Sequence, residues 1–188
     1  MHDILREIPA EFTTDRLVIR IPRPGDGPII HAGVVDALES LRAWPASLPW
    51  AQFEPSVEAS ELHARSSYAD YVLRKNLNML ILLRDSGEYV GGTGFHDIDW
   101  AIPKLEVGYW CRPKFQNTGL TTEAVRRISD FAIQALGAKR ITSLPDSENI
   151  PSRRVAEKSG FILEGIMRSD RKSPNGEYRD TCMYARVA

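Results

Sequence analysis

Apolar residues gather in three stretches in the middle of the chain, separated only by short polar turns. The first stretch is continuously apolar, which is typical of a buried strand, and residues 85–87 turn it into the second. Gly91, Gly92 and Gly94 in the second stretch indicate close backbone approach or a bulge. Strands that follow one another so closely pair as an antiparallel meander, here expected at 78–84, 88–98 and 104–112.

Helical spacing appears on both sides of this meander. In the segment that begins at Pro55, one face combines Leu62, Ala69, Val72 and Leu73, and we expect that face to be buried. The segment after residue 119 carries its own apolar stripe and ends at a glycine, residue 137. We expect this second stripe to pack on the sheet through Val125, Ile128, Ala132 and Ala135.

The remaining segments complete a mixed sheet covered by helices. We expect a strand at 12–21, a helix from the turn 22–28 to about residue 41, a strand at 139–144, a helix at 150–158 and a hairpin of 161–172 with 178–187. The 188 residues show no repeats or linkers and fit one domain, 1–188. The predicted fold class is α/β (α+β), with a mixed, mostly antiparallel central sheet of about seven strands flanked by helices.

Composition excludes several classes of protein. The formal net charge is −1, so no global basic field would draw the chain onto nucleic acid or a membrane surface. No apolar segment approaches the roughly 18 residues needed to span a bilayer, and the N-terminal segment lacks the apolar core of a signal peptide. We therefore expect a cytoplasmic protein. Its two cysteines, Cys111 and Cys182, show neither CxxC spacing nor nearby histidines, so neither a disulfide nor a metal site is predicted.

Residues 111–123 combine a strand end, a Gln-x-x-Gly turn and the start of a helix. Pro113 ends the strand pairing, and Gly119 supplies a backbone position without a side chain. The first N–H groups of a helix have no partner inside it and attract a phosphate, with Thr121 or Thr122 expected as the cap. The segment thus predicts a phosphate cradle, although an ordinary strand-turn-helix corner would fit the same six residues.

This cradle resembles the acyl-CoA-binding motif of the GNAT superfamily of N-acetyltransferases, Gln/Arg-x-x-Gly-x-Gly/Ala. Gln116 and Gly119 fall on its first and fourth positions, while Thr121 replaces the Gly or Ala of the sixth. Four flanking segments resemble the RimJ/RimL-type enzymes, whose founding members acetylate the N-termini of ribosomal proteins. These are Glu-x-Gly-Tyr-Trp at 106–110, Asn-x-x-Ser-x-x-Val-x-x-x-x-Gly-Phe at 149–161, Thr-Asp-Arg-Leu-x-Ile-Arg at 14–20 and Asn-Gly-Glu-Tyr-Arg-Asp-x-x-x-Tyr-Ala at 175–185.

The resemblance implies acetyl-CoA as co-substrate and no metal. It also implies that the two strands nearest the cradle splay apart, leaving a wedge for the pantetheine arm, and that an N–H near Cys111 donates to the thioester carbonyl. The basic cluster of Arg153, Arg154 and Lys158 suits either the 3′-phosphate of CoA or an ordinary solvated helix face. The expected acetyl-CoA contacts are Trp110, Cys111, Arg112, Gln116, Asn117, Thr118, Gly119, Leu120, Thr121, Thr122, Asn149, Ser152 and Arg154.

Acetyl transfer to an amine needs one group to remove a proton and one to supply a proton to the CoA thiolate. Ser152 resembles the serine proposed as general acid in the ribosomal branch; its alternative role, helix capping, suits Asn149 better. Glu106 resembles the catalytic glutamate of histone-acetylating relatives, but a strand carboxylate is more often solvated or paired. Asp170 is the rival base, unless the alignment places Arg171 at that position and leaves the work to Glu106 or a water chain.

The acceptor site is the least defined part of the sequence. Trp44 and Trp50 flank an irregular segment with two prolines, which is either a substrate lip or a plug at the edge of the core. His96 follows the glycine-rich strand as a further substrate-site candidate, although a lone histidine is more often structural. Cys111 could carry an acetyl group, but no histidine is placed in sequence to activate it, and the resemblance implies direct transfer between bound partners, so direct transfer is preferred.

These features predict an acetyl-CoA-dependent N-acetyltransferase that moves an acetyl group directly to a primary amine. The expected acceptor is a protein N-terminal α-amine of the ribosomal-protein type. A polyamine, an aminoglycoside or an amino-acid-like amine is the alternative, and an acidic groove would favour polyamines. From another class, the chain could be an acyl-CoA-binding module without catalysis. The resemblance also implies a homodimer to which the C-terminal hairpin contributes.

Overall fold

The computed structural model describes residues 2–188 and contains an eight-stranded sheet in the order β1-β2-β3-β4-β5-β6-β8-β7. Neighbouring strands are antiparallel except β5 and β6, which run parallel. The strands are β1 Glu11–Thr13, β2 Leu17–Arg20, β3 Leu77–Leu83, β4 Tyr89–Asp99, β5 Lys104–Cys111, β6 Arg140–Ser143, β7 Ile162–Lys172 and β8 Tyr178–Val187. The predicted mixed, mostly antiparallel sheet flanked by helices is confirmed.

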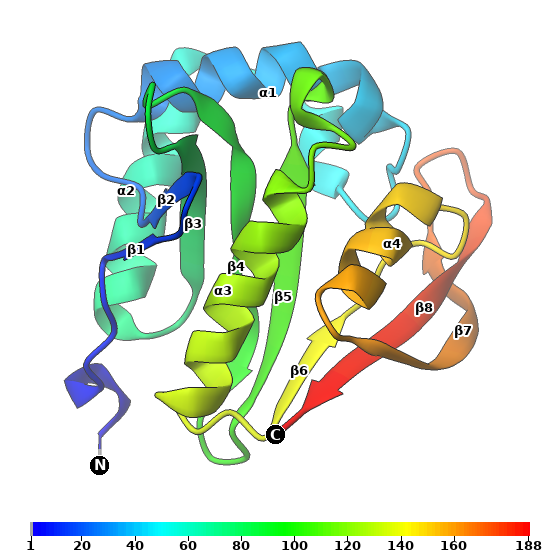
Figure 1. The fold of residues 1–188 in the computed structure, drawn as a ribbon. Coiled ribbons are helices and arrows are strands. Elements are labelled where there is room, and N and C mark those ends of the chain that lie inside the picture. Colours follow the sequence, from blue (N-terminus) through cyan, green and yellow to red (C-terminus); the bar gives the residue numbers. More distant parts are fainter. Residues whose placement is uncertain (1) are drawn as a thin grey trace.

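Four helices cover the two faces of the sheet (Figure 1). Helices α3 and α4 lie on one face, and α1 and α2 lie on the other. They are α1 Gly27–Arg42, α2 Val57–Leu73, α3 Leu120–Gln134 and α4 Ile150–Lys158, with 3-10 turns at Asp3–Leu5, Pro49–Gln52 and Pro113–Phe115. The α3 stripe is buried at Val125, Ile128 and Ala132 as predicted, whereas Ala135 at the end of the helix is exposed.

Two predictions about the N-terminal half were wrong. The single strand expected at 12–21 is two short strands, because Leu17 N–H donates to Thr14 Oγ1 and closes a tight hairpin between them. Helix α2 buries its small residues Ser60, Ala64 and Ser67 rather than the expected apolar face. On that expected face Leu62 is 66% exposed, and its partners are exposed as well. Small side chains let α2 approach the sheet closely. The apolar spacing therefore predicted the wrong face of α2 as the buried one.

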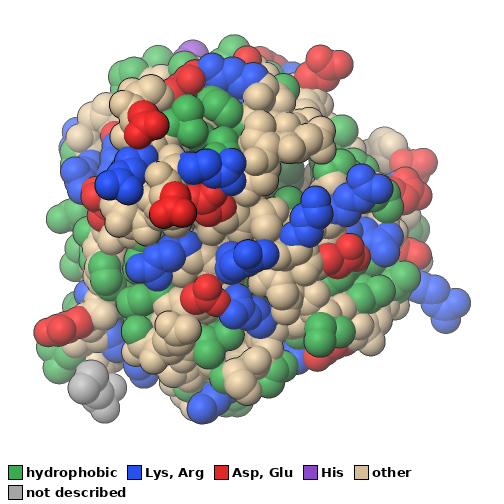
Figure 2. Space-filling view, in the orientation of Figure 1, with side chains coloured by type: hydrophobic (Ala, Val, Ile, Leu, Met, Phe, Trp, Pro, Cys, Tyr) green, Lys and Arg blue, Asp and Glu red, His purple; other side chains and the backbone are tan. Residues whose placement is uncertain are grey.

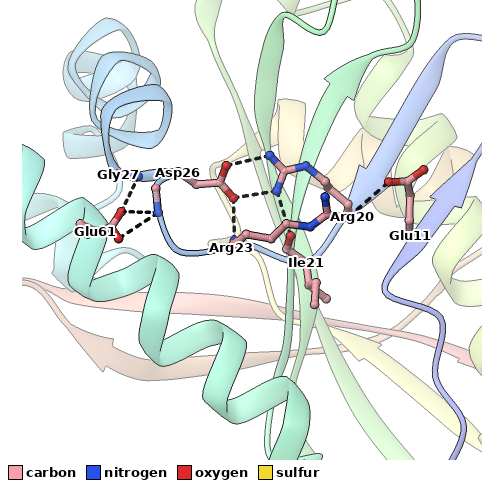
Figure 3. Close-up of polar contacts among 8 residues, drawn as sticks. Glu11, Arg20, Ile21, Arg23, Asp26, Gly27 and Glu61 are labelled. Carbon is pink, nitrogen blue, oxygen red and sulfur yellow. Dashed lines mark hydrogen bonds and ion pairs between the residues drawn. The ribbon is translucent and has the colours of Figure 1, made fainter.

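Arg20 and Glu61 fix the relative position of α1 and α2 (Figure 3). Arg20 donates to both carboxylate oxygens of Asp26, at 2.6 and 2.8 Å, at the start of α1. Burial opposes ionisation of Asp26, but the bonds from Arg20 hold its pKa below the ordinary value. Glu61 of α2 accepts hydrogen bonds from the N–H groups of Gly25 and Gly27, at 2.9 to 3.0 Å. The two helices therefore form one roof over their face of the sheet.

None of the helices in residues 2–188 is both long and apolar enough to cross a membrane.

Candidate active site

Strands β5 and β6 separate partway along their length. They pair at only three successive positions, from Lys104 with Arg140 to Glu106 with Thr142. Beyond Glu106, β5 continues to Cys111 while β6 ends at Ser143. Figure 2 shows the surface hollowed between the start of α3 and α4, with Lys and Arg side chains at the edge of the hollow. The predicted wedge is therefore present.

The helix that faces this wedge, α3, begins without a side-chain cap. Its N-cap is Gly119, with φ of 80°, and its first backbone bond runs from Glu123 N–H to the Gly119 carbonyl at 3.0 Å. The three preceding amides, of Leu120 to Thr122, start the helix without a partner inside it. A Cβ built on Gly119 would meet only Arg16 Nη2, at 3.6 Å, so the space over these amides is open. An open, positive helix end of this kind fits a pyrophosphate.

The predicted threonine cap was wrong. The helix begins at Leu120, so Thr121 and Thr122 lie inside its first turn, and Thr121 is buried. Because Thr121 at the sixth motif position is buried, its branched side chain does not project into the solvent over the cradle. The replacement of Gly or Ala by Thr121 is thus accommodated by burying the larger side chain in the core.

The N-terminal hairpin braces the cradle from outside. Arg16 donates to the Thr118 carbonyl at 3.1 Å and to Glu123 at 2.7 Å, and Thr14 donates to the same carboxylate at 2.5 Å. Burial opposes ionisation of Glu123, but these donors hold its pKa below the ordinary value. This gives a structural role to the Thr-Asp-Arg-Leu segment that the sequence identified only by resemblance.

Helix α4 forms the other side of the wedge. Asn149 accepts from Ser152 N–H at 3.1 Å, so Asn149 caps the helix and Ser152 does not. Ser152 is half-buried, and its carbonyl accepts a hydrogen bond at 2.9 Å from the hydroxyl of Tyr109 on β5. Tyr109 also lies 3.3 Å from Ser143 Oγ, so its side chain bridges the two sides of the wedge. Burial raises the pKa of Tyr109, which keeps the hydroxyl protonated and available as a donor.

Three positions at the end of β5 were expected to serve the pantetheine, and one of them, Arg112 just after the strand, is already engaged. Its N–H donates to the Val90 carbonyl at 2.9 Å, and its side chain donates to Asp36 at 2.8 Å. Since backbone groups alternate sides along a strand, the Cys111 N–H points away from β4, toward the wedge. Burial raises the pKa of the Cys111 thiol, against a smaller opposing effect of Thr121. A protonated thiol is a poor nucleophile, which disfavours an acetyl-cysteine intermediate.

Glu106 lies at the closed end of the wedge, on the face of the sheet that α1 and α2 cover. It pairs across the strands with His96, and its Oε1 lies 3.9 Å from His96 Nε2. Its side chain is 18% exposed, and burial raises its pKa while His96 opposes the rise. Because its pKa is raised, Glu106 is a stronger base than an ordinary carboxylate, which suits it to accept a proton.

Asp97 completes this acid–base cluster. A bulge in β4 places it at φ of 48°, with its carboxylate 3.1 Å from His96 Nδ1. Ligand-type atoms of His96, Asp97 and Glu106 lie within 4.8 Å of one another, a spacing that a cation would also fit. The Asp97 side chain is 82% exposed, however, and exposed acidic groups commonly stand beside a histidine without a metal.

The rival base, Asp170, is less well placed. Its carboxylate lies 3.7 Å from Arg171 on the same strand, so the neighbouring guanidinium competes with a substrate amine for it. Arg171 is close enough to Glu106 to act electrostatically on its pKa, in the lowering direction. Within the basic cluster, Arg153 is held by Ser147 and Tyr184, whereas Arg154 is exposed. Arg154 is therefore the freer side chain for a phosphate.

A cavity of about 720 Å³ lies between the sheet and the roof formed by α1 and α2. His96 and Trp50 line it, as does His63 of α2, while Trp44 does not. Partial withdrawal from water lowers the pKa of His63, so it is neutral at neutral pH. The expected acceptor side chains thus separate: Trp50 and His96 share one cavity, and Trp44 packs at the end of α1, where its carbonyl accepts from Leu48 N–H.

A wedge with a phosphate cradle at one end and a half-buried acid–base pair at the other defines an acyltransferase that takes its acyl group from a CoA thioester. An acetyltransferase (GNAT) domain family matches residues 16–162, and the chain belongs to this family of N-acetyltransferases. The family predicted from the sequence is therefore confirmed.

Individual relatives agree with this assignment. The chain is 29% identical to the uncharacterized N-acetyltransferase YoaA of Bacillus subtilis over 132 residues, 70% of this chain and 74% of YoaA. It spans little more than half the length of two other Bacillus relatives.

Two solved structures share the fold over almost the whole chain. Microcin C7 self-immunity acetyltransferase MccE, in complex with acetyl-CoA and AMP, superposes with a TM-score of 0.86 at 22% identity, covering 96% of this chain and 98% of MccE. RimL, a ribosomal L7/L12 α-N-protein acetyltransferase in complex with coenzyme A, superposes with a TM-score of 0.83 at 25% identity, covering 96% and 97%. Both neighbours carry the CoA moiety, in agreement with the donor predicted here.

Four residues with a place in this site were not singled out by sequence. Tyr109 and Arg16 lay inside segments quoted for their resemblance, so their position was visible but their contacts were not. His63 is one of only four histidines in the chain, and Glu123 is the first acidic residue after the Gln-x-x-Gly turn. The rarity of histidine and the position of Glu123 after the turn could therefore have marked these residues as candidates. The tertiary contacts that give the four side chains their roles could not be read from the sequence.

Proposed function

We propose that this protein transfers the acetyl group of acetyl-CoA directly to a primary α-amine while both substrates are bound. The observation that carries the proposal is the alignment of three features along one strand, β5. The open amides at Gly119 to Thr122 follow its end, the Cys111 N–H faces the wedge, and Glu106 stands where the wedge closes. Acetyl-CoA, when bound, supplies the activated thioester.

The side chains then divide the proton transfers between them. Glu106, whose pKa is raised by burial, accepts the proton of the attacking ammonium through a chain of waters, because five residues of β5, roughly 16 Å, separate it from the Cys111 N–H. The Cys111 N–H stabilises negative charge on the thioester oxygen. Ser152 at the start of α4 supplies the proton to the departing sulfur, and the Tyr109 hydroxyl, bonded to the Ser152 carbonyl, is the second donor available there.

A polypeptide N-terminus is the first acceptor that we propose, because RimL, an α-N-protein acetyltransferase, shares the fold and the motif segments of this chain resemble the RimJ/RimL-type enzymes. A free amino-acid-like amine is the second, because the cavity is covered by the α1–α2 roof and the 42–56 segment and is large enough for a whole small molecule. A polyamine is not favoured, since Glu54 is the single carboxylate among the described residues that line the cavity.

Calorimetric titration with acetyl-CoA tests the donor site. We expect saturable micromolar binding by the parent protein and loss of binding in Gly119→Tyr. The matched control is Gly137→Tyr, because Gly137 also has a left-handed φ, of 71°, and open space around it, but lies at the other end of α3. Equal weakening by both variants, or no binding by the folded parent, would remove the basis of the proposal.

A binding module without catalysis would pass that titration, so turnover has to be measured separately. Release of the CoA thiol in the presence of an amine, lost in Glu106→Gln, distinguishes the enzyme from the module. We also propose a cytoplasmic homodimer; light scattering of the purified protein gives its mass directly.

A further inference from the structure

The chemistry of the acceptor cavity restricts the kind of amine that can be the acceptor. This step rests on the proposed function. We propose that the acceptor is a primary amine that carries an aromatic or similarly large apolar group next to the amine-bearing carbon. The same group could belong to a small amino-acid derivative or to the first residue of a peptide, and the experiment below separates these two sources.

The cavity lining has almost no charge. Glu54 is its single carboxylate within the described chain, and that side chain is 86% exposed and bonded to Arg42 at 2.7 Å, at the mouth. The remaining polar lining residues are serines, threonine, asparagine, tyrosine and the two histidines. Apart from Glu106 and Asp97 beside His96, a polycation would find no compensating charge inside, so desolvation of its further ammonium groups would oppose binding. An uncharged, apolar group would gain from the same surroundings.

Aromatic side chains form one end of the cavity. Trp50 and Trp110 lie with ring centroids 6.2 Å apart at 53°, and Tyr89 meets Trp110 edge-on at 5.8 Å. At the mouth, Phe53 is 75% exposed and Trp50 is 43% exposed. Large apolar faces that remain in water gain free energy when a ligand covers them, and an aromatic ring also satisfies the preferred tilted geometry of such pairs.

The floor of the cavity sets the distance between this aromatic end and the acid–base pair. On the face that α1 and α2 cover, β4 and β5 present three successive cross-strand pairs: Gly92 with Trp110, Gly94 with Gly108, and His96 with Glu106. The central pair has no side chains, so it leaves a hollow. Glu106 and Trp110 are four residues apart on one strand, roughly 13 Å. The amine attacks the thioester beside the Cys111 N–H, and Cys111 directly follows Trp110 in β5, so a large group next to the amine-bearing carbon lies close to the rings. Glu106 receives the proton at the far end of the hollow.

Initial rates of CoA thiol release, with product masses, would be compared for L-phenylalanine amide, L-serine amide, spermidine and two short peptides that differ only in beginning with Phe or Ser. We expect kcat/KM for phenylalanine amide to exceed that for serine amide by at least about tenfold, because burying a large apolar side chain is worth roughly ten- to hundredfold in affinity. Spermidine should be the poorest acceptor. Activity with the Phe peptide indicates a polypeptide source, and activity with the amide alone indicates a small molecule.

Two variants tie the preference to the cavity. Phe53→Ala should reduce the advantage of phenylalanine amide over serine amide several-fold. Tyr178→Ala, which removes a similarly exposed aromatic side chain from β8, should leave that advantage unchanged. Equal rates for all amines, a preference for spermidine, or equal effects of both variants would overturn the inference and leave the proposed acetyltransferase intact. No turnover of any amine by protein that binds acetyl-CoA would also overturn it. Failure to bind acetyl-CoA would instead remove the proposed function itself.

Discussion

Glu106→Gln is the most informative single substitution, because it removes the carboxylate but keeps the size of the side chain. General bases contribute about 10²- to 10⁴-fold to rate, or roughly 2.7–5.5 kcal/mol of barrier. His96 Nε2 lies 3.9 Å away and can take over part of the proton transfer, so we expect the lower end, a fall in kcat of about 100-fold. The acetyl-CoA dissociation constant should not change, because the cradle lies at the other end of β5.

The same variant should be more stable than the parent at alkaline pH. Burial raises the pKa of Glu106 in the folded protein above its ordinary value of 4.5. A group of this kind contributes stability below its unfolded pKa and loses that contribution as the pH rises through its folded pKa. Melting temperatures should therefore differ at pH 8 but not at pH 4, by about 2–4 °C for each kcal/mol of difference in a domain of this size.

Activity and pH together decide whether Glu106 is the base. In the parent, kcat/KM should rise with pH through the raised pKa of Glu106, and this acid limb should vanish in Glu106→Gln. The rival, Asp170→Asn, serves as the comparison. If the Glu106 variant keeps kcat within threefold of the parent and retains the acid limb, while Asp170→Asn loses both, the roles given to the two carboxylates are reversed.

Four further outcomes follow from the contacts around the wedge. Tyr109→Phe should slow turnover about tenfold if its hydroxyl supplies the proton, with Ser152→Ala measured beside it to separate the two donors by single-turnover kinetics. Arg16→Ala should weaken acetyl-CoA binding by calorimetry while leaving kcat at saturation unchanged, because the Thr118 carbonyl and Glu123 lose their brace. Asp146→Asn should cost about 1–3 kcal/mol in urea unfolding at pH 7, since Asp146 is 3% exposed and accepts two bonds from Arg179. The pKa of Asp146 is lowered in the folded protein, so the difference declines below the unfolded pKa of 3.8 and is lost as the pH falls through the folded pKa. Dialysis against EDTA should leave activity unchanged, because the proposed proton transfers use side chains alone.

The sequence predicted the sheet more completely than the face that each helix buries. The meander of β3, β4 and β5 and the helix α4 stand where their patterns placed them, because strands with continuous apolar runs and strong turn residues have few alternatives. Helix α2 buries Ser60, Ala64 and Ser67, and small residues give no apolar signal. The break between β1 and β2 was missed because residues 14–16 contain neither Gly nor Pro.

The parts of the site that use backbone groups could be predicted from the sequence. The parts that depend on contacts between side chains from different strands could be predicted less well. The cradle follows from local sequence, since Gly119 and the helix start are neighbours in the chain. The pairing of His96 with Glu106 depends on the register between β4 and β5, including a bulge at Asp97 that has no sequence signature. The thiol, hydroxyl and carboxylate pKa directions depend in turn on burial, which only the packed structure gives.

Gly94 of β4 and Gly108 of β5 face each other across the strand pair, and they differ in how well substitution there could change the acceptor. A methyl group on Gly94 would collide with the Leu77 carbonyl, and its φ of 153° already disfavours other residues, so substitution there should cost the fold. Gly108 has no such constraint, and a Cβ there would stand 3.2 Å from His96 Nε2, close enough to displace only that ring. A saturation library at position 108 should therefore yield folded enzymes with progressively shorter acceptors, whereas the same library at position 94 should yield mostly insoluble protein. The acceptor range of this enzyme can be changed by selection at one side of a single strand pair.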